Sequence, residues 1–194
     1  MDILISGVGG QGTILASKIL ASGAALTSGV CARTGETIGM SQRGGCVVSH
    51  VRTEEVCSSY IPQGCADLIL SFELCEGARN IPWLKKGGHA IVNTAQINPI
   101  TVALGASTYD TQAIKDYISE NSHAYFVDAN SIALSCGSVK TVNVVLVGIA
   151  FGLSLLDVSK ESIITAINKN VKPRFFEMNT DAFEAGIKAS ASLK

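Results

Sequence analysis

Residues 3–12 read Ile-Leu-Ile-Ser-Gly-Val-Gly-Gly-Gln-Gly, and this stretch decides the fold. The apolar run at its start predicts a buried strand, and the pattern that follows it predicts a helix. Glycines between the two let the backbone turn tightly and approach a ligand without a Cβ in the way. The first turn of the helix offers unpaired N–H groups and a positive dipole end. The stretch therefore predicts a strand–turn–helix unit that either binds an anion or is a tight connection without a ligand.

A second glycine-rich stretch, residues 35–45, reads Gly-Glu-Thr-Ile-Gly-Met-Ser-Gln-Arg-Gly-Gly. The guanidinium of Arg43 presents a planar set of donors that suits a carboxylate or a phosphate. Gly44 and Gly45 beside it allow the backbone to come close to the bound group. Gln42 either orders the loop or touches the ligand. Arg43 either contacts the ligand or pairs with Glu36 and fixes the loop, and both roles are compatible.

The spacing of the first glycines also matches the dinucleotide pattern G-x-G-x-x-G. A dinucleotide fold adds an acidic residue about 20 residues further on, at the end of the second strand, which holds the ribose. Glu36 stands near that distance. We expect it to lie in a glycine-bounded loop with Gln42 and Arg43 rather than at a strand end, which disfavours a nicotinamide cofactor.

Together the two stretches resemble the gamma-type subunit of the 2-oxoacid:ferredoxin oxidoreductases, which is the beta subunit in the indolepyruvate enzymes. That family carries a G-x-G-G-Q-G turn, then a glutamate, then Q-R-G-G leading into a strand that ends S-H-V-R. The matching positions here are residues 7–12, Glu36, residues 42–45 and residues 49–52. Further matches occur at residues 61–62, 66–67, 72–73, 87–88, 91–93, 172–173, 179 and 182–183, so the resemblance covers nearly the whole chain. The wording of the second stretch is most similar to the indolepyruvate branch.

The resemblance implies a subunit of an enzyme that converts a 2-oxo acid, such as indolepyruvate or pyruvate, to acyl-CoA and CO2 while it reduces ferredoxin. It implies that thiamine diphosphate, magnesium and iron–sulfur clusters sit in partner subunits, and that coenzyme A is a co-substrate. No cofactor is expected to bind tightly to this chain, which is not expected to be active alone. We expect it to line the active site or the coenzyme A path. The candidate ligand-binding residues are Gly7, Gly9, Gly10, Gln11, Gly12, Glu36, Gln42, Arg43, Gly44 and Gly45.

Two absences agree with this division of labour. The sequence has no G-D-G followed by a downstream asparagine, the usual signature for thiamine diphosphate, and no ferredoxin-type run of cysteines. Two functions of other classes stay open: a free-standing oxidoreductase that binds NAD or a flavin, and a non-catalytic scaffold whose loops serve only docking. Binding of NAD(H) by the isolated chain favours the first, and assembly that survives loop mutation favours the second.

Composition narrows the functional classes further. The chain has 194 residues, of which 47% are hydrophobic and 16% charged, with a net charge of −1. Such an apolar chain has a large core or covers part of its surface with a partner, and its charge gives no case for nucleic acid or an anionic membrane. The most apolar run, residues 142–156, is shorter than the ~20 residues of a membrane span. We expect one cytoplasmic domain over residues 1–194.

The cysteines and histidines do not have the sequence spacing of known metal-binding motifs. The six cysteines, Cys31, Cys46, Cys57, Cys65, Cys75 and Cys136, form no C-x-x-C pair, and most of them are expected to be free thiols that act as small core residues. His50 lies in the strand after the second stretch, where a structural role is favoured over a catalytic one. His89 and His123 each begin a predicted strand and have no ligand neighbours at metal spacing. No catalytic residue is assigned.

Apolar runs alternate with helical patterns, which predicts a three-layer α/β/α fold with a mostly parallel, mixed sheet. Strands are expected at residues 2–6, 67–72, 89–93 and 123–128, with a short extended segment at residues 30–34. Residues 46–53 and 56–59 are expected to form an antiparallel hairpin around Glu54 and Glu55. Helices are expected at residues 12–29, 73–84, 111–121, 129–136, 141–156, 159–170 and 180–191, the second of them ended by Lys-Lys-Gly-Gly at residues 85–88.

Overall fold

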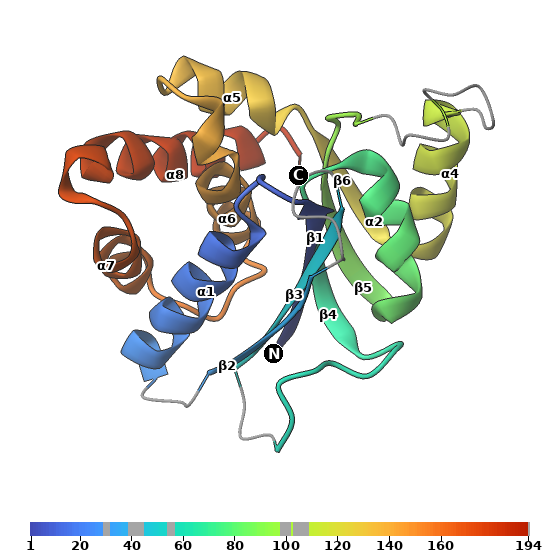
Figure 1. Ribbon diagram of the computed structural model, residues 1–194, viewed down its shortest axis with the longest axis horizontal. Coiled ribbons are helices and arrows are strands. Elements are labelled where there is room, and N and C mark those ends of the chain that lie inside the picture. Colours follow the sequence, from blue (N-terminus) through green and yellow to red (C-terminus); the bar gives the residue numbers. More distant parts are fainter. Residues whose placement is uncertain (29–31, 39–44, 54–56, 98–101, 103–108, 194) are drawn as a thin grey trace.

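A six-stranded sheet lies between two layers of helices (Figure 1), which confirms the predicted fold class. The computed structural model describes residues 1–28, 32–38, 45–53, 57–97, 102 and 109–193. The strands are β1 (Asp2–Val8), β2 (Arg33–Ile38), β3 (Cys46–Arg52), β4 (Ala66–Ser71), β5 (Leu84–Asn93) and β6 (His123–Val127), in the order β2-β3-β1-β4-β5-β6.

The sheet changes polarity at β1. On one side β1 pairs parallel with β4, and β5 and β6 continue in the same direction. On the other side β3 pairs antiparallel with both β1 and β2. The antiparallel element was predicted, but its position was wrong: β3 pairs with the strand before it, and residues 57–59 form no strand. Glu54, Glu55 and Val56, the predicted hairpin turn, lie outside the described residues.

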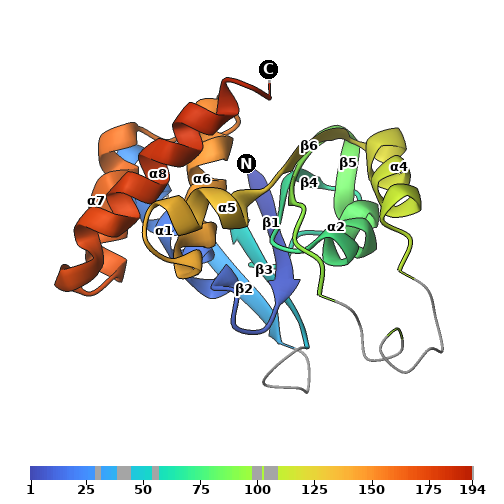
Figure 2. The ribbon, with the colours of Figure 1, turned by 90° about the horizontal axis from the view of Figure 1, so that it is seen from above.

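Helices cover both faces of the sheet (Figures 1 and 2). On one face, α1 (Thr13–Ser28) and α6 (Val142–Gly152) contact the strands, with α5 (Ala129–Ser135), α7 (Lys160–Asn170) and α8 (Phe176–Ser190) packed around them. On the other face lie α2 (Leu74–Asn80) and α4 (Thr111–Asn121). Each face has its own apolar cluster. Ile3, Ile5 and Leu70 point to the α1 side, and Leu4, Ile69 and Val92 point to the α2 side, as the alternation of strand side chains requires.

Several predicted helix boundaries were wrong, among them the end predicted at residue 156, since α6 ends at Gly152. The helix predicted at residues 73–84 ends at Asn80 and is followed by a short 3-10 turn, Ile81–Trp83. Pro82 lacks the N–H that would continue the helix. Strand β5 therefore begins at Leu84, and Lys85 and Lys86 belong to the strand rather than to a helix end. The last helix starts at Phe176, directly after the 3-10 turn Pro173–Phe175, and not at Thr180.

Helix α6 is the apolar run that the sequence placed in the core. Every residue from Val142 to Ala150 is buried, so the helix is enclosed on all sides. No helix among the described residues has the length and apolarity to cross a membrane. Helix α6 packs most closely on α8, where Gly148 and Gly186 face each other. A Cβ on Gly148 would overlap the carbonyl oxygen of Phe183, and one on Gly186 would overlap the carbonyl oxygen of Val145.

We predict that Gly186→Ala destabilises the protein although alanine has the higher helix propensity. Propensity alone would add about 1 kcal/mol of stability. Overlap with the backbone of α6 should outweigh it, because a backbone carbonyl cannot move aside, and overpacking of this kind costs about 1–3 kcal/mol. Thermal melting should show a lower Tm for Gly186→Ala. Lys188→Ala, an exposed change in the same helix, is the control and should stay within about 0.5 kcal/mol of the parent. An unchanged Tm for Gly186→Ala would contradict the close packing.

Candidate functional site at the carboxyl edge of the sheet

The glycine turn leaves the carboxyl end of β1 and leads into α1. Gly10 and Gly12 have φ angles of 102° and 87°, a region that L side chains rarely adopt. A Cβ on Gly12 would lie 2.9 Å from the side-chain nitrogen of Asn143, whereas one on Gly10 would meet nothing within 4 Å. The turn therefore packs against α6 on the Gly12 side and faces open space on the Gly10 side.

Gln11 braces this turn from within. Its side-chain oxygen accepts a hydrogen bond from the backbone N–H of Val8 at 2.7 Å. Its side-chain nitrogen donates to the carbonyl oxygen of Phe72, at the end of β4, at 3.2 Å. Both ends of the amide are thus bound inside the chain, and Gln11 joins the carboxyl ends of β1 and β4.

The carbonyl oxygen of Phe72 is also the acceptor for a second amide. Asn93, the last residue of β5, donates to it at 3.0 Å and to the side-chain oxygen of Asn130 at 3.1 Å. The side-chain oxygen of Asn93 accepts from the backbone N–H of Ala129 at 3.0 Å. Because Asn93 is fully buried, these bonds tie the ends of the parallel strands into one rigid edge.

Four backbone N–H groups at the turn remain available. Those of Gly10, Gly12, Thr13 and Ile14 have no hydrogen-bond acceptor among the described residues. They belong to the turn and to the first turn of α1, where the helix dipole favours negative charge. A cavity of about 170 Å³ adjoins the turn and is lined by Gly10, Gln11, Asn130, Val139, Lys140 and Val142. The donors and the Lys140 ammonium make this edge suited to an anionic group.

A second cavity lies on the other side of Lys140. It has a volume of about 280 Å³, shares Lys140 with the first cavity, and adds Lys172 as another cation. Its apolar lining includes Leu15, Phe175 and Met178. The two cavities together offer cations beside an apolar surface.

The second glycine-rich stretch starts from the same edge of the sheet. The carbonyl oxygen of Gly45 accepts a hydrogen bond from the N–H of Gly9 at 2.9 Å. Strand β3 begins at the next residue, opposite Val8 of β1, and β2 ends at Ile38 beside Val47. The structure therefore brings Gly45 to the glycine turn. Gln42, Arg43 and Gly44 lie outside the described residues.

Glu36 does not lie in a loop, as the sequence suggested, but within β2, where it pairs with Ser49 of β3. Ser49 in turn pairs with Ile5, so Glu36 is level with the middle of β1 and not with its end. Strand β3 separates the two strands, which puts β2 roughly 9–10 Å from β1. A ribose-binding acid sits on the strand next to β1 in the dinucleotide fold. Glu36 is therefore out of place for that role.

Two buried carboxylates at this edge were not singled out from the sequence as site residues. Glu73 follows β4 and accepts hydrogen bonds from the N–H groups of Glu76 and Ile97, and from the hydroxyl of Tyr109 at 2.6 Å. Burial, with Glu73 beside it, raises the pKa of the Tyr109 hydroxyl, which therefore remains a donor. The carboxylate of Glu76 accepts a hydrogen bond from the thiol of Cys46 at 2.7 Å. An acid that follows the apolar end of a strand and precedes a helix was the available signal for Glu73, since that is an N-cap position.

His50 has a structural role. Its Nδ1 accepts a hydrogen bond from the N–H of Ile61 at 3.3 Å, and its ring makes edge contacts with the rings of Tyr60 and Trp83. Burial, with the charge of Arg52 nearby, lowers the pKa of His50 and keeps the imidazole neutral. His89 and His123 lie side by side on β5 and β6. No three His, Cys, Asp or Glu side chains gather as a metal site within the described ranges, and the five cysteines there are free thiols.

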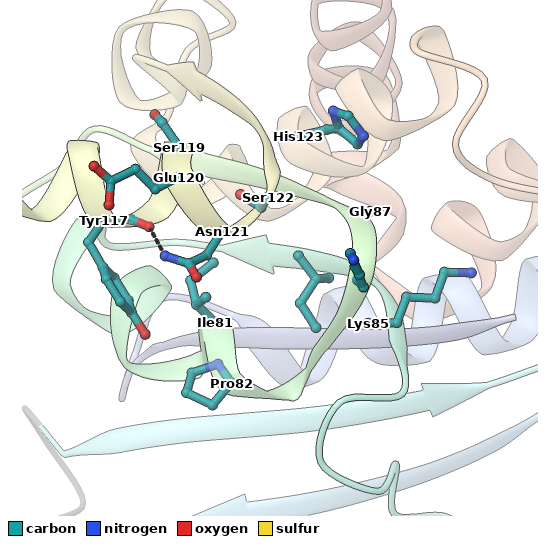
Figure 3. A pocket seen from close by; sticks show the side chains of 12 residues that line it. Ile81, Pro82, Lys85, Gly87, Tyr117, Ser119, Glu120, Asn121, Ser122 and His123 are labelled. Atoms are coloured by element: carbon teal, nitrogen blue, oxygen red, sulfur yellow. Dashed lines mark hydrogen bonds between the residues drawn. The ribbon is translucent and has the colours of Figure 1, made fainter.

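A larger cavity, of about 780 Å³, opens at the other end of the sheet (Figure 3). Tyr117 and Glu120 of α4 lie on one side of it and Lys85 of β5 on the other. Lys85 is ion-paired with Asp67, Lys86 and Glu120 contribute one charge of each sign, and α4 ends here with its negative dipole end. This cavity is therefore less suited to an anion than the carboxyl edge, where four N–H groups have no acceptor among the described residues, and the carboxyl edge is the better candidate site.

Comparison with known proteins agrees with this fold. Residues 2–189 match the pyruvate ferredoxin/flavodoxin oxidoreductase family. The chain is 40% identical to an indolepyruvate oxidoreductase subunit IorB from Thermococcus kodakarensis, over 99% of this chain and 96% of the relative. The chain therefore belongs to the pyruvate ferredoxin/flavodoxin oxidoreductase family and is a gamma-type subunit of a 2-oxoacid:ferredoxin oxidoreductase.

Solved structures show the same fold. The gamma subunit of a keto/oxoacid ferredoxin oxidoreductase from Geobacter sulfurreducens superposes with a TM-score of 0.72 at 26% identity and covers 98% of both chains. A 2-oxoglutarate:ferredoxin oxidoreductase from Magnetococcus marinus, solved with 2-oxoglutarate, coenzyme A and succinyl-CoA bound, gives a TM-score of 0.75 at 18% identity. All of this chain matches 31% of that one, and at this identity the likeness concerns the fold alone.

We predict that Gln11→Glu destabilises the turn. The substitution keeps the acceptor for Val8 but replaces the donor to Phe72 with a carboxylate oxygen, so two acceptors face each other. Loss of a partly buried hydrogen bond with an unpaired group left behind costs about 1–3 kcal/mol. Denaturant unfolding of the purified chain measures this loss. Gln63→Glu, at an exposed glutamine, is the matched control and should leave the midpoint unchanged. Equal midpoints for both variants would show that Gln11 is no brace.

Proposed function

We propose that this chain forms one wall of the active site of an indolepyruvate-type 2-oxoacid:ferredoxin oxidoreductase, or of its coenzyme A path. The observation that carries the proposal is the meeting of the two glycine-rich stretches at one sheet edge through the Gly9–Gly45 hydrogen bond. The N–H groups that have no acceptor among the described residues, together with Lys140 at that edge, suit the phosphates of coenzyme A or the carboxylate of the 2-oxo acid. Arg43 is proposed as a second cation there.

The reaction is oxidative decarboxylation of a 2-oxo acid to acyl-CoA and CO2, with electrons passed to ferredoxin. Thiamine diphosphate, when bound, supplies the carbanion chemistry. We assign it, with its magnesium ion and the iron–sulfur clusters, to partner subunits, because the sequence lacks the corresponding motifs. The proposed share of this chain is to bind and orient anionic groups through donors that already point at the ligand. A single cytoplasmic domain is part of the same proposal.

Indolepyruvate is proposed as the substrate because of the 40% identity to the Thermococcus subunit over almost the whole chain. The apolar cavity that shares Lys140 with the cavity beside the glycine turn is compatible with a large, partly apolar ligand. Pyruvate is the second candidate.

Reconstitution tests the proposal. The chain should be purified with the subunits that accompany it in its native host, and ferredoxin reduction should be followed with coenzyme A and each of indolepyruvate, pyruvate and 2-oxoglutarate. We expect activity only in the complex, with the highest kcat/KM for indolepyruvate. Turnover by the isolated chain would contradict the proposal. A complex that keeps full activity after mutation of the glycine turn would favour the scaffold alternative.

Lys140→Ala should raise the KM of the complex for coenzyme A or for the 2-oxo acid. Lys140 lines the cavity beside the glycine turn, and the loss of one charge-assisted hydrogen bond of at least about 1.4 kcal/mol corresponds to about a 10-fold change. Steady-state kinetics with each substrate varied in turn identifies which one Lys140 holds. The control is Lys86→Ala at the opposite end of the sheet, which should leave both KM values as they are. If Lys140→Ala behaves like Lys86→Ala, Lys140 is no part of the site.

NADH should not bind to the isolated chain. Glu36 lies two strands away from β1 and level with its middle, so the ribose hydroxyls would have no acid at the usual place. Calorimetric titration should show no saturable binding at micromolar concentration, equivalent to about −8 kcal/mol. Tight binding that Glu36→Ala abolishes would overturn the proposal in favour of a free-standing nicotinamide enzyme.

A further inference from the structure

The first residue of β3, Cys46, stands at the base of the second glycine-rich stretch. It directly follows Gly45, whose carbonyl oxygen holds the N–H of Gly9, and it pairs with Val8 across the strands. Its thiol points toward α2 and donates a hydrogen bond to the carboxylate of Glu76 at 2.7 Å. The backbone of Cys46 therefore pairs with β1, while its side chain is hydrogen-bonded to α2.

Glu76 is held in place from several sides. Its side chain is only 8% exposed, and the guanidinium of Arg79 lies 3.4 Å from its second oxygen. Its backbone carbonyl accepts hydrogen bonds from the hydroxyl of Ser6 in β1 and from the side chain of Asn80. Because these contacts fix α2 to β1, the Glu76 carboxylate has a fixed position, and the Cys46 thiol is hydrogen-bonded to it.

We propose that Cys46 and Glu76 form a positioning pair that holds the base of the second glycine-rich stretch against the glycine turn. The contacts run without a break from Glu76 to Cys46, along the chain to Gly45, and across to Gly9. This inference rests on the proposed function, since it concerns the order of that same site. In the pair the thiol acts as a hydrogen-bond donor, and neither as a nucleophile nor as a metal ligand.

The electrostatics around the thiol support this role. Burial and the neighbouring Glu76 carboxylate raise the pKa of Cys46 to about 12, while the more distant charge of Arg79 opposes the shift only in part. The thiol therefore keeps its proton at neutral pH. A thiolate is needed for nucleophilic attack or for metal binding, so this environment favours hydrogen bonding over reactivity. Cys65, by contrast, is exposed and its thiol only contacts the carbonyl oxygen of Gln63.

The kinetic test uses the reconstituted complex with Cys46→Ala, Cys46→Ser and the control Cys65→Ala. Cys46→Ala removes the donor and should raise the KM for coenzyme A or the 2-oxo acid by about 10-fold, the change expected when a hydrogen bond to a charged group is lost. Cys46→Ser supplies a hydroxyl donor at the same place and should restore the KM to within about threefold. Cys65→Ala should match the parent. A lower Tm for Cys46→Ala with unchanged KM values would reduce the pair to a purely structural contact and overturn the proposal.

A chemical test needs neither turnover nor a folded alanine variant. Alkylation by iodoacetamide at about pH 9, followed for each cysteine by mass spectrometry, should modify Cys46 much more slowly than Cys65 in the parent complex. Glu76→Gln removes the negative charge beside the thiol, so alkylation of Cys46 should become faster. Equal rates for Cys46 and Cys65 in the parent complex would exclude the pair. A parent complex that fails to oxidise any 2-oxo acid would instead overturn the proposed function, and the alkylation rates would still decide whether the pair exists.

Discussion

The structure depends on the way β1 is paired on its two sides. Its parallel partner β4 and its antiparallel partner β3 run in opposite directions, so the carboxyl end of β1 meets the carboxyl end of β4 and the amino end of β3 at one edge. Any loop that leaves β1 and any loop that enters β3 must therefore lie close together. The Gly9–Gly45 hydrogen bond joins these two loops and follows from this constraint.

The candidate site at the same edge has donors that are fixed in place by other side chains. Gln11 and Asn93 share the carbonyl oxygen of Phe72, and every bond that they make is internal. These amides hold the turn rigid, while the N–H groups of Gly10, Gly12, Thr13 and Ile14 have no acceptor among the described residues. Donors that are fixed in advance need no reorganisation when they meet negative charge, which is why such sites bind and catalyse well. The carboxylates Glu73 and Glu76 serve the scaffold on the α2 side of the sheet.

The apolar side chains of this chain lie in two kinds of place, the core and the surface. Much of it fills the two apolar clusters, above all α6, whose residues from Val142 to Ala150 are all buried. Some stays on the surface: Leu134 and Val139 are 67% and 51% exposed, and Val139 lines the cavity beside Lys140. Exposed apolar side chains at the rim of the candidate site are compatible with a subunit whose site is closed by a partner.

Prediction from the sequence succeeded where short-range chemistry decides the outcome. Strand β1, its glycine turn and α1 were predicted nearly to the residue, because apolar runs and glycines act locally. Boundaries failed where tertiary packing or a single proline intervened. Residues 85 and 86 carry the charges of a helix end, yet Pro82 had already ended the helix, and Leu84 was drawn into the sheet as a buried strand residue.

By itself the sequence determined the fold class, the family and the two glycine-rich stretches, since these depend on residue types and their spacing along the chain. Only the tertiary structure decided which strands are neighbours, and neighbour relations are set by packing between distant segments. In the strand order β2-β3-β1, Glu36 lies on β2, which is not adjacent to β1, and Gly45, which directly precedes β3, is hydrogen-bonded to Gly9. The tertiary structure also places the Cys46 thiol against the Glu76 carboxylate. It places Lys140, which belongs to no sequence motif, in the lining of the cavity beside the glycine turn.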